Sequence, residues 1–377
     1  MSLLINSAAP SKTPAQSIDL FGDPANRDGK FAREYLKHAF PKDKVVEKFR
    51  EMLLMRRFEE RCGQEYRKGK IKGFCHLYIG QEAVASGSIA ALEAQDYIIT
   101  AYRDHAHALA RGLSSREVMA ELYMKYPGGT KGKGGSMHLF HGKNRFFGGH
   151  GIVGGQIPLA AGMAFASAYR NEPAVTVCYF GDAAFNQGVF HESANMASLW
   201  NLPVVYICEN NQVGMGTLTS RSCAVPDLYR RTAEAYRMDG IRCDGMCVEE
   251  MYSVTKEAAE RARTEGRPCF IEAITYRYRG HSMSDPATTY RTPNEVSTWE
   301  QRDPMLKLRS RHPDLLTDAV VEKLEAEIAA EVEDAVQFSV EADLPPLEEI
   351  WTHVYVDCPG YPDASVSKHP YEYHYDM

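Results

Sequence analysis

Two kinds of segment alternate between residues 157 and 276, and this alternation constrains the fold more than any other feature of the sequence. Stretches with helical spacing of apolar residues alternate with short apolar runs. We expect helices at 157–170, 189–199, 227–237 and 248–264, and strands at 174–180, 204–208 and 269–276. Strands separated by helices pair in parallel through right-handed crossovers. The pattern predicts an α/β fold with a doubly wound, mostly parallel sheet and helices on both faces.

The segments around this region are of other kinds. We expect further helices at 43–66, 81–92, 115–126 and 315–340, and a polar loop at 280–304. Residues 127–155 hold eleven glycines in twenty-nine positions. That is too many for regular structure and is typical of backbone that lies close to a ligand or another chain.

The domain division follows from these expectations. We expect a flexible N-terminal tail at 1–28, an α/β domain with a helical N-terminal part at 29–350, and a C-terminal tail at 351–377.

Charge and cysteine content exclude several classes of protein. The formal net charge is −7, from 43 Lys and Arg against 50 Asp and Glu, whereas nucleic-acid binding requires a basic surface. The longest uncharged run, 146–169, contains His150, Gln156 and Pro158, unlike a membrane span. Nine irregularly spaced cysteines do not resemble a disulfide framework, and no transit peptide is recognisable. These features favour the cytoplasm.

Polar residues follow two successive predicted strands. Asp182 comes after the first strand and Asn211 after the second, twenty-nine positions later, which is the length of a strand-helix-strand unit. On neighbouring parallel strands these two side chains would emerge at one edge of the sheet. There they could share an octahedral cation such as Mg²⁺. The alternative is that Asp182 caps a helix and that Asn210 and Asn211 form a turn.

The segment 149–154 fits the pattern G-x-G-x-x-G of dinucleotide-binding proteins. That fingerprint requires a preceding apolar strand, and here a glycine-rich loop is expected instead. The pattern is therefore weak support for an NAD-binding oxidoreductase, which stays an alternative from a different class.

Six blocks of sequence carry a closer resemblance. They are GFCHLYIGQEA (73–83), ITAYRDH (99–105), KGKGGSMH (131–138), GGHGIVGGQIPLAAG (148–162), ICENNQVGMGT (207–217) and YRYRGHSMSDP (276–286). In this order they resemble the alpha subunits of thiamine-dependent pyruvate dehydrogenase components. The resemblance implies the thiamine diphosphate-binding fold and a reaction between glycolysis and acetyl-CoA biosynthesis. By the same resemblance, we expect the enzyme to decarboxylate pyruvate on thiamine diphosphate with Mg²⁺ and to pass the acetyl unit to a lipoyl group.

The resemblance also implies roles for individual residues. Asp182, Asn211 and the Val213 carbonyl would bind Mg²⁺, and Tyr102, Arg103 and His281 would face the cofactor diphosphate. The Gly151 and Val153 backbone would contact the aminopyrimidine, and His76 would lie near the reacting carbons, with His281 able to manage a proton. The remaining cofactor-binding positions are Gly181, Ala183 and Ala184. The family usually has Gly where this chain has Ala183, which keeps the amide donor but disfavours positive φ.

Partners and regulation follow from the same resemblance. The family takes a catalytic glutamate from a beta subunit, so we expect an α₂β₂ heterotetramer and an inactive isolated chain. The acetyl acceptor would be a lipoyl-bearing dihydrolipoyl acetyltransferase. Residues 276–290 resemble a loop that is phosphorylated in mitochondrial relatives, with Ser282 and Thr289 at the modified positions.

Two other interpretations share part of this pattern. One is the alpha subunit of an acetoin or other 2-oxo acid dehydrogenase, although GFCHLYIGQEA and RGHSMSDP favour pyruvate. The other is a non-catalytic scaffold with the same fold, which the presence of Asp182, Asn211, Arg103 and His281 disfavours.

Overall fold

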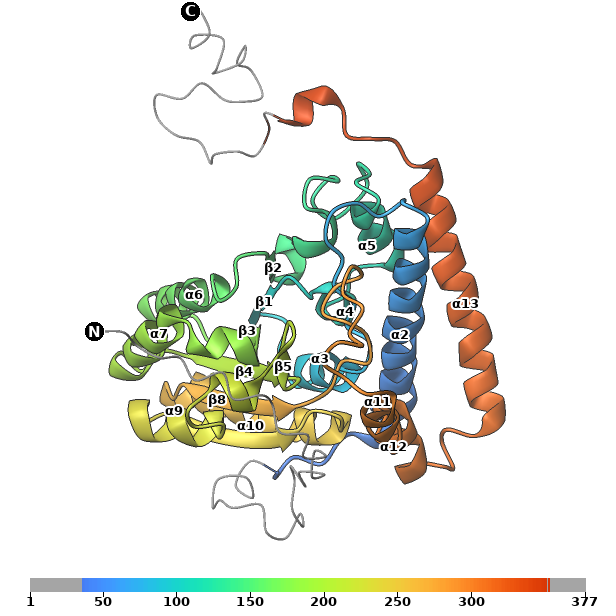
Figure 1. Cartoon of the computed structure of the whole chain (residues 1–377). Helices are drawn as coiled ribbons and strands as arrows, with labels where there is room; N and C mark the ends of the chain where they lie inside the picture. The colour runs from blue at the N-terminus through green and yellow to red at the C-terminus, as the bar shows by residue number, and fades with distance from the viewer. Residues whose placement is uncertain (1–35, 351, 353–377) are drawn as a thin grey trace, which may run out of the picture.

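A six-stranded sheet forms the centre of the molecule in a computed structural model that describes residues 36–350 and 352 (Figure 1). Its strands are β1 (Tyr97–Ala101), β2 (Phe146–His150), β3 (Thr176–Gly181), β4 (Val204–Asn210), β7 (Asp239–Asp244) and β8 (Cys269–Ile274). They lie in the order β2-β1-β3-β4-β8-β7, and every neighbouring pair is parallel. The predicted doubly wound parallel sheet is confirmed. A small antiparallel hairpin, β5 (Val213–Gly214) and β6 (Thr217–Leu218), follows β4.

The sequence indicated only the three strands that are buried on both faces. Strands β3, β4 and β8 are nearly continuous apolar runs, as expected for the centre of a parallel sheet. Strand β1 is short, β7 begins and ends with Asp, and β2 lies inside the glycine-rich segment. The expectation that 127–155 lacks regular structure is therefore wrong. Strand β2 forms because β1 offers it an open edge to pair with.

Helices cover both faces of the sheet. One face carries α6 (Gln156–Arg170), α7 (Gly188–Leu199) and α9 (Leu228–Tyr236). The other carries α3 (Glu82–Ala90), α4 (His105–Ala110) and α10 (Val248–Glu265). Each face has its own buried apolar cluster, so the sheet is shielded from water on both sides, as the alternating pattern predicted.

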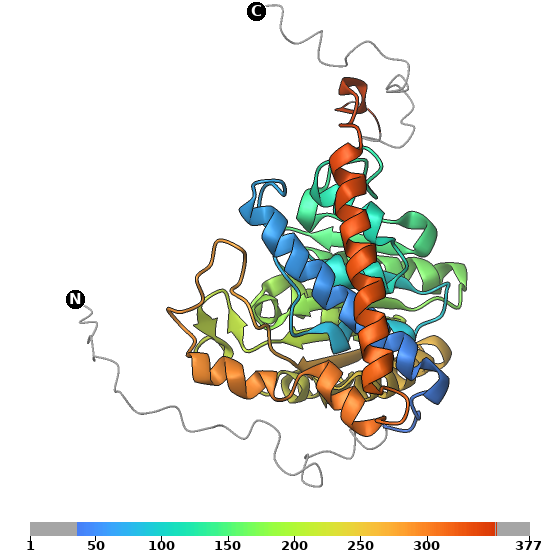
Figure 2. The same ribbon diagram turned by 90° about the vertical axis from the view of Figure 1, so that its right-hand side faces the viewer.

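Two long helices form an outer layer over α3 and α4. Figure 2 shows α13 (Asp318–Glu341) beside α2 (Val45–Arg67), and α13 also packs on α5 (Ser115–Leu122). Its buried residues include Leu324, Ile328 and Val332, which share one helical face. The end of the chain thus covers elements from its beginning.

The predicted loop at 280–304 is wrong in its second half. Helix α11 (Pro293–Glu300) lies inside it, and α12 (Pro304–Arg311) follows. The Thr292 side chain accepts a hydrogen bond from the Glu295 amide, and Pro293 occupies the first turn. These are ordinary helix-start signals.

The remaining short elements are η2 (Lys42–Lys44), η3 (Gly135–Met137), η4 (Gly142–Asn144), η5 (Asp182–Asn186), α8 (Thr219–Ser222) and η6 (Leu347–Ile350). The predicted tails, 1–28 and all of 351–377 except Thr352, lie outside the described residues. Within the described part of the chain, every helix is too short or too polar to cross a bilayer.

Candidate active site

The carboxyl ends of five parallel strands surround one cleft of about 570 Å³. Asp182 follows β3 and Asn211 follows β4, while β1, β2 and β8 are followed by Tyr102, Gly151 and Arg277. The cleft is lined by nearly every residue that the sequence proposed for a site: His76, Tyr102, Arg103, Gly151, Val153, Gly181, Asp182, Ala183, Ala184, Asn211, Val213, His281 and Ser282. Thr289 is exposed and does not line it.

An unsatisfied oxygen lies on the floor of this cleft. In the parallel register Gly181 pairs with Glu209, so Asp182 and Asn211 emerge at the same edge of the sheet. The Asn211 side chain donates to Gln81 Oε1 at 3.1 Å, whereas its buried Oδ1 has no hydrogen-bond partner. An orphaned buried acceptor near a carboxylate is the donor chemistry of a hard cation.

The two neighbouring asparagines have different surroundings. Asn210 donates to Glu272 Oε1 at 2.7 Å, and its Oδ1 accepts from the Gln212 amide at 3.0 Å. The turn predicted as the alternative therefore exists, but Asn210 makes it. Asn211 is left with a free oxygen in the cleft.

Thr219 orients the Asp182 carboxylate. Its hydroxyl donates to Asp182 Oδ2 at 2.5 Å, and burial raises the pKa of Asp182. The N-cap residue of η5 is Gly181, and Asp182 is the first residue of that helix, so Asp182 does not occupy the cap position that the alternative gave it. The carboxylate is thus held by the β6–α8 segment, which the sequence analysis did not connect with it.

Two buried guanidinium groups face the same cleft. Arg103 donates to the carbonyls of Leu77 at 2.5 Å and His281 at 2.8 Å, and Arg277 donates to those of Val213 at 3.0 Å and Met215 at 3.1 Å. Among the described residues neither forms an ion pair with a carboxylate. Burial, and then the charge of Arg277, lower the pKa of Arg103 to about 10. Uncompensated buried cations are costly, so this pair indicates a site for an anion.

Arg277 and Gln81 are functional candidates that the sequence analysis missed. Both lie within the quoted blocks and line the cleft. Gln81 Nε2 is buried without a partner. Both residues belong to sequence blocks that resemble the family, but the sequence does not show which side chains of a block point into the cleft.

Three rings from His76, Tyr102 and His281 form another part of the cleft wall. The His76 ring centroid lies 4.4 Å from that of Tyr102 and 5.1 Å from that of His281. Burial and the nearby positive charge of Arg103 lower the pKa of His76 to about 2 and that of His281 to about 4. Both imidazoles are therefore neutral near pH 7, and His76 Nδ1 is buried without a partner.

The loop that carries His281 is fixed by hydrogen bonds of its own. Asp285 accepts from the His281 amide at 2.6 Å, from the Ala287 amide at 3.1 Å, and from the Tyr290 hydroxyl. Arg291 donates to the carbonyls of Arg277 and Arg279. Ser282 is partly buried at the edge of the cleft.

Glycines at positions 151 and 214 leave room for neighbouring side chains beside the cleft, His138 in the first case and Ala183 in the second. A Cβ atom on Gly151 would lie 3.1 Å from the His138 ring. Ala183 does not have positive φ, so the alanine at this position causes no backbone strain. A Cβ on Gly214 would come within 2.5 Å of the Ala183 methyl group, and the chain accommodates the alanine because residue 214 is glycine.

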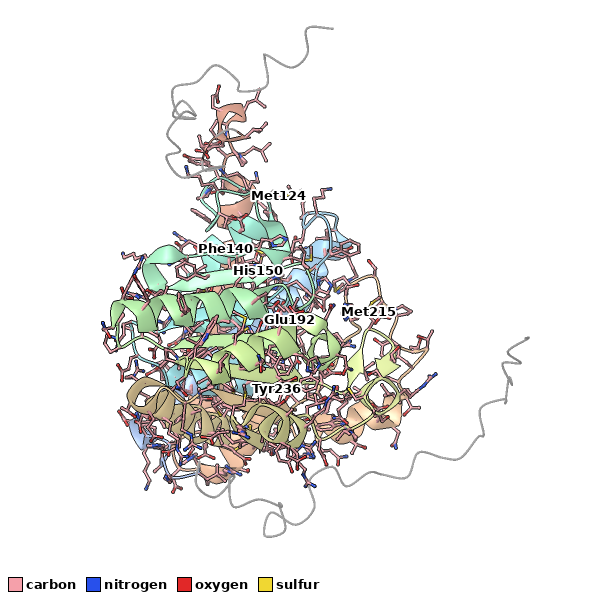
Figure 3. All side chains as sticks on the ribbon, turned by 90° about the vertical axis from the view of Figure 1, so that its left-hand side faces the viewer. Met124, Phe140, His150, Glu192, Met215 and Tyr236 are labelled. Carbon is pink, nitrogen blue, oxygen red and sulfur yellow. The ribbon has the colours of Figure 1, made fainter. Side chains whose placement is uncertain are left out.

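Apolar side chains are exposed around the mouth of the cleft. Phe74, Val153 and Met215 line it and are 63%, 41% and 67% exposed, and Ile152 beside it is 80% exposed. Figure 3 shows Met215 to one side of α6 and α7, in the hairpin that follows β4. Apolar groups gathered at the mouth of a polar cleft indicate that something covers it.

Comparison with known proteins decides the family. A family model described as the dehydrogenase E1 component matches residues 50–348. The chain belongs to the dehydrogenase E1 component family. Among its relatives are proteins named pyruvate dehydrogenase E1 component subunit alpha from Rickettsia bellii and Rhizobium meliloti, each 47% identical over 84% of this chain and 97% and 91% of the relative. A relative from Dictyostelium discoideum with the same name, marked mitochondrial, is 46% identical over 84% of this chain and 83% of its own.

E1 components use thiamine diphosphate, and the cleft fits such a cofactor. It offers two unpaired guanidiniums to a diphosphate and an orphaned amide oxygen beside a carboxylate to a cation. Strand β2 (FFGGH) overlaps the first two residues of the glycine pattern at 149–154, so part of the expected loop is a strand, but it is not an apolar strand that precedes the pattern. Membership of the E1 family also gives no support to the NAD-binding alternative.

The two cleft histidines predict how stability depends on pH. Their folded pKa values, about 2 for His76 and about 4 for His281, lie below the ordinary 6.5. The unfolded chain therefore binds more protons between pH 6.5 and pH 4, and the free energy of unfolding falls as the pH falls through this window. Denaturant unfolding from pH 7 to pH 4.5 should show a shallower dependence for His281→Asn than for the wild type.

Phe74→Leu is the control, because this ring lies 6.4 Å from that of His76 and binds no proton. Its pH dependence should equal that of the wild type. Equal slopes for His281→Asn and the wild type would contradict the assignment of a neutral imidazole.

Proposed function

We propose that this chain is the alpha subunit of a pyruvate dehydrogenase component, which decarboxylates pyruvate on thiamine diphosphate and transfers the acetyl unit to a lipoyl group. Relatives with that name match 84% of the chain. The observation that carries the proposal is the juxtaposition of Asp182, the free oxygen of Asn211 and two unpaired arginines in one cleft.

Mg²⁺ would be held by Asp182, Asn211 and the Val213 carbonyl. The Val213 oxygen accepts one hydrogen bond from Arg277 and retains a second lone pair for a cation. These three oxygens come from two neighbouring strand ends and the first strand of the hairpin. Mg²⁺ commonly keeps its other positions for phosphate oxygens and water.

The diphosphate would lie against Arg103 and Tyr102, with Arg277 as a further cationic partner. Gly181, Ala183 and Ala184 line the same cleft, and their backbone amides would donate to the diphosphate. His281 is tied to Arg103 through its carbonyl, so the loop that carries it and the diphosphate site are coupled.

Thiamine diphosphate, when bound, supplies the carbon nucleophile and electron sink that decarboxylation requires. The chain supplies orientation and proton management. The Gly151 and Val153 backbone would orient the aminopyrimidine. His76 and His281 would act as neutral imidazoles that accept or donate a proton beside the substrate. The apolar rim, once covered, would exclude water.

A beta subunit would complete the site. The carboxylates that line the cleft are Asp182 and Glu209, and Glu209 accepts a hydrogen bond from the Tyr78 hydroxyl. Neither is free to protonate an aminopyrimidine at Gly151. We propose that a beta subunit supplies this acid within an α₂β₂ assembly, and that a lipoyl-bearing dihydrolipoyl acetyltransferase receives the acetyl unit. The eight described cysteines are buried free thiols, which supports a reducing compartment such as the cytoplasm.

The assay of the assembled enzyme tests this function. The chain co-expressed with its beta subunit should bind thiamine diphosphate in the presence of Mg²⁺, measured by calorimetry, and should decarboxylate pyruvate in preference to acetoin and branched 2-oxo acids. The isolated chain should be inactive. Full activity of the isolated chain would contradict the shared site, and a preference for another substrate would contradict the pyruvate assignment.

The adjacent asparagines provide a matched test of the metal site. Asn211→Ala removes the free oxygen, so the affinity of the assembled enzyme for thiamine diphosphate with Mg²⁺ should fall about tenfold or more. Asn210→Ala removes a partner of Glu272 and should lower the free energy of unfolding by about 1–3 kcal/mol while the cofactor affinity is unchanged. Equal losses of affinity in the two variants would contradict the assignment.

Ser282 is the position at which we propose regulation by phosphorylation, with Thr289 as a second site. A phosphate on Ser282 would bring about two negative charges to the edge of the diphosphate site and repel the cofactor. Ser282→Glu should therefore weaken cofactor binding more than Thr289→Glu, because Thr289 lies outside the cleft. Mass spectrometry of native protein that finds both residues unmodified under all growth conditions would count against the modification itself.

A further inference from the structure

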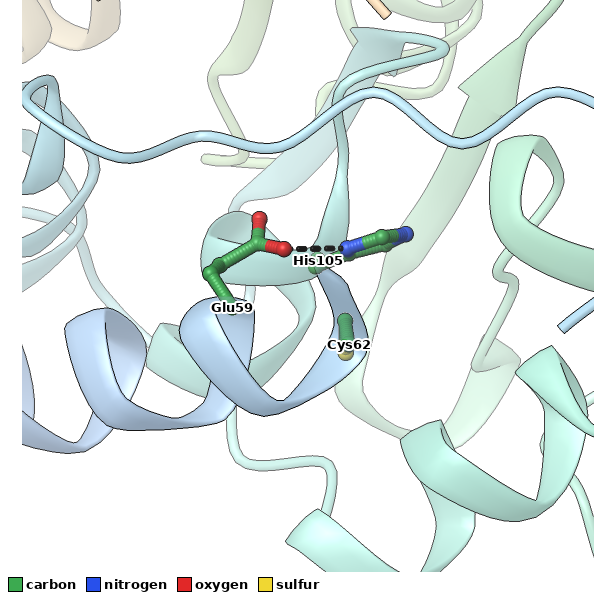
Figure 4. A group of neighbouring side chains, drawn as sticks. All are labelled: Glu59, Cys62 and His105. Carbon is green, nitrogen blue, oxygen red and sulfur yellow. Dashed lines mark hydrogen bonds and ion pairs between the residues drawn. The ribbon is translucent and has the colours of Figure 1, made fainter. Parts of the chain in front are cut away.

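A buried ion pair lies behind the wall of the cleft that carries His76. Glu59 on α2 is 1% exposed, and His105 at the start of α4 is fully buried. Figure 4 shows the Glu59 carboxylate facing the His105 ring, and Glu59 Oε2 lies 2.9 Å from His105 Nδ1. Neither residue lines the cleft, so the function proposed above does not use them.

Glu59 and His105 each form hydrogen bonds to a different segment of the cleft wall. Glu59 Oε1 accepts a hydrogen bond from the Tyr78 amide at 2.8 Å. His105 Nε2 lies 2.9 Å from the carbonyl oxygen of Ser136 and 2.9 Å from its hydroxyl. Tyr78 follows His76 and Leu77 in the chain, and Ser136 precedes Met137, which lines the cleft.

The third segment is the one that carries Arg103. His105 lies two residues after Arg103 in the chain, and the Arg103 guanidinium donates to the Leu77 carbonyl at 2.5 Å. The segments that present His76, Arg103 and Met137 thus meet at one ion pair. These three segments are far apart in the sequence, so hydrogen bonds between neighbouring residues of the chain cannot hold them together. Contacts across the fold, such as this ion pair, are required.

The geometry sets the protonation of the pair. His105 Nδ1 faces the Glu59 carboxylate, and Nε2 faces both the carbonyl and the hydroxyl oxygen of Ser136. Acceptor oxygens on both sides of the ring favour the imidazolium, which can donate at both nitrogens. The charge of Glu59 raises the pKa of His105 to about 9 in spite of burial. The other titratable groups around the pair are Asp104, His76, Arg103 and the thiols of Cys62 and Cys75. Burial raises the pKa of Asp104 to about 7. Burial also raises the pKa of the Cys62 thiol well above its ordinary value.

Cys62 makes this cluster resemble a metal site, because Glu59, Cys62 and His105 offer ligand atoms within 4.8 Å of one another. A metal-binding thiol must lose its proton, and the ring nitrogen that a metal would need carries the proton donated to Glu59. The cluster therefore fits a structural ion pair and not a cation.

We propose that Glu59 and His105 are positioning residues of the cofactor cleft, whose ion pair sets the relative placement of His76, Arg103 and Met137. This inference rests on the proposed function. The pair acts through the wall segments and does not touch the cofactor. Its imidazolium also adds to the positive charge that keeps His76 neutral.

Two substitutions at Glu59 separate geometry from charge. Glu59→Gln keeps an oxygen for the Tyr78 amide and presents an NH₂ group to a now neutral His105 Nδ1, so both hydrogen bonds survive. Glu59→Ala removes both. In the assembled enzyme Glu59→Ala should raise the dissociation constant for thiamine diphosphate about tenfold and lower kcat about 10- to 100-fold. Glu59→Gln should restore most of kcat, with the acid limb of its pH profile moved to higher pH because His76 gains proton affinity.

Asp96→Ala is the matched control. Asp96 is fully buried, accepts from the Val175 amide at 2.9 Å and pairs with Arg263 at 2.8 Å. It precedes β1, at the edge of the sheet opposite the cleft. The control should lower the melting temperature while the cofactor dissociation constant and kcat per folded molecule stay at wild-type values.

The possible outcomes are distinct. The positioning role would be overturned if Glu59→Ala kept the cofactor affinity and kcat of the wild type. It would also be overturned if Glu59→Ala and Asp96→Ala lost affinity and kcat equally. Neither result affects the proposed function, because the wild-type enzyme is active in both cases. A wild-type assembly that neither binds the cofactor nor decarboxylates a 2-oxo acid would overturn the proposed function and this inference together. If Glu59→Ala does not fold, Glu59→Asp replaces it. This variant keeps the negative charge on a side chain one methylene shorter, so it should lower kcat. An unchanged kcat would overturn the proposal.

Discussion

The parallel register between β3 and β4 is the constraint on which the rest of the site depends. Because Gly181 lies opposite Glu209, β3 and β4 end side by side, and Asp182, one residue after that pair, and Asn211, two residues after it, both line the cleft at the carboxyl edge of the sheet. A shift by one residue would turn each side chain to the opposite face. The buried apolar clusters on the two faces fix that register. The core of the protein and the proposed cation site therefore have the same origin.

The cleft is built at a cost to stability. It contains two buried arginines without carboxylate partners, two histidines held neutral and an amide oxygen without a donor. Each of these would be unfavourable in a protein selected for stability alone. Their concentration at one edge, where a diphosphate and a cation would satisfy them together, is what distinguishes a binding site from a core.

Sequence reasoning predicted those features that depend on local pattern. The central strands were found because burial on both faces makes them continuous apolar runs. The residues proposed for the site lie in recognisable blocks, and nearly all of them line one cleft. It could not find β2, since glycine gives no strand signal and the pairing partner β1 decides its structure. Helix α11 was missed although Thr292 and Pro293 mark its start. The distinction between Asn210 and Asn211, and the part played by Thr219 and Glu59, depend on contacts between segments that are distant in the chain.

The exposed rim of Phe74, Ile152 and Met215 has a consequence for the cell. In the proposed assembly, a chain synthesised in excess of its beta subunit would leave these apolar side chains in water, where they favour self-association. Balanced production of the two polypeptides, such as translation from one shared message, would thus protect the free chain from aggregation as well as supply the enzyme in the correct stoichiometry.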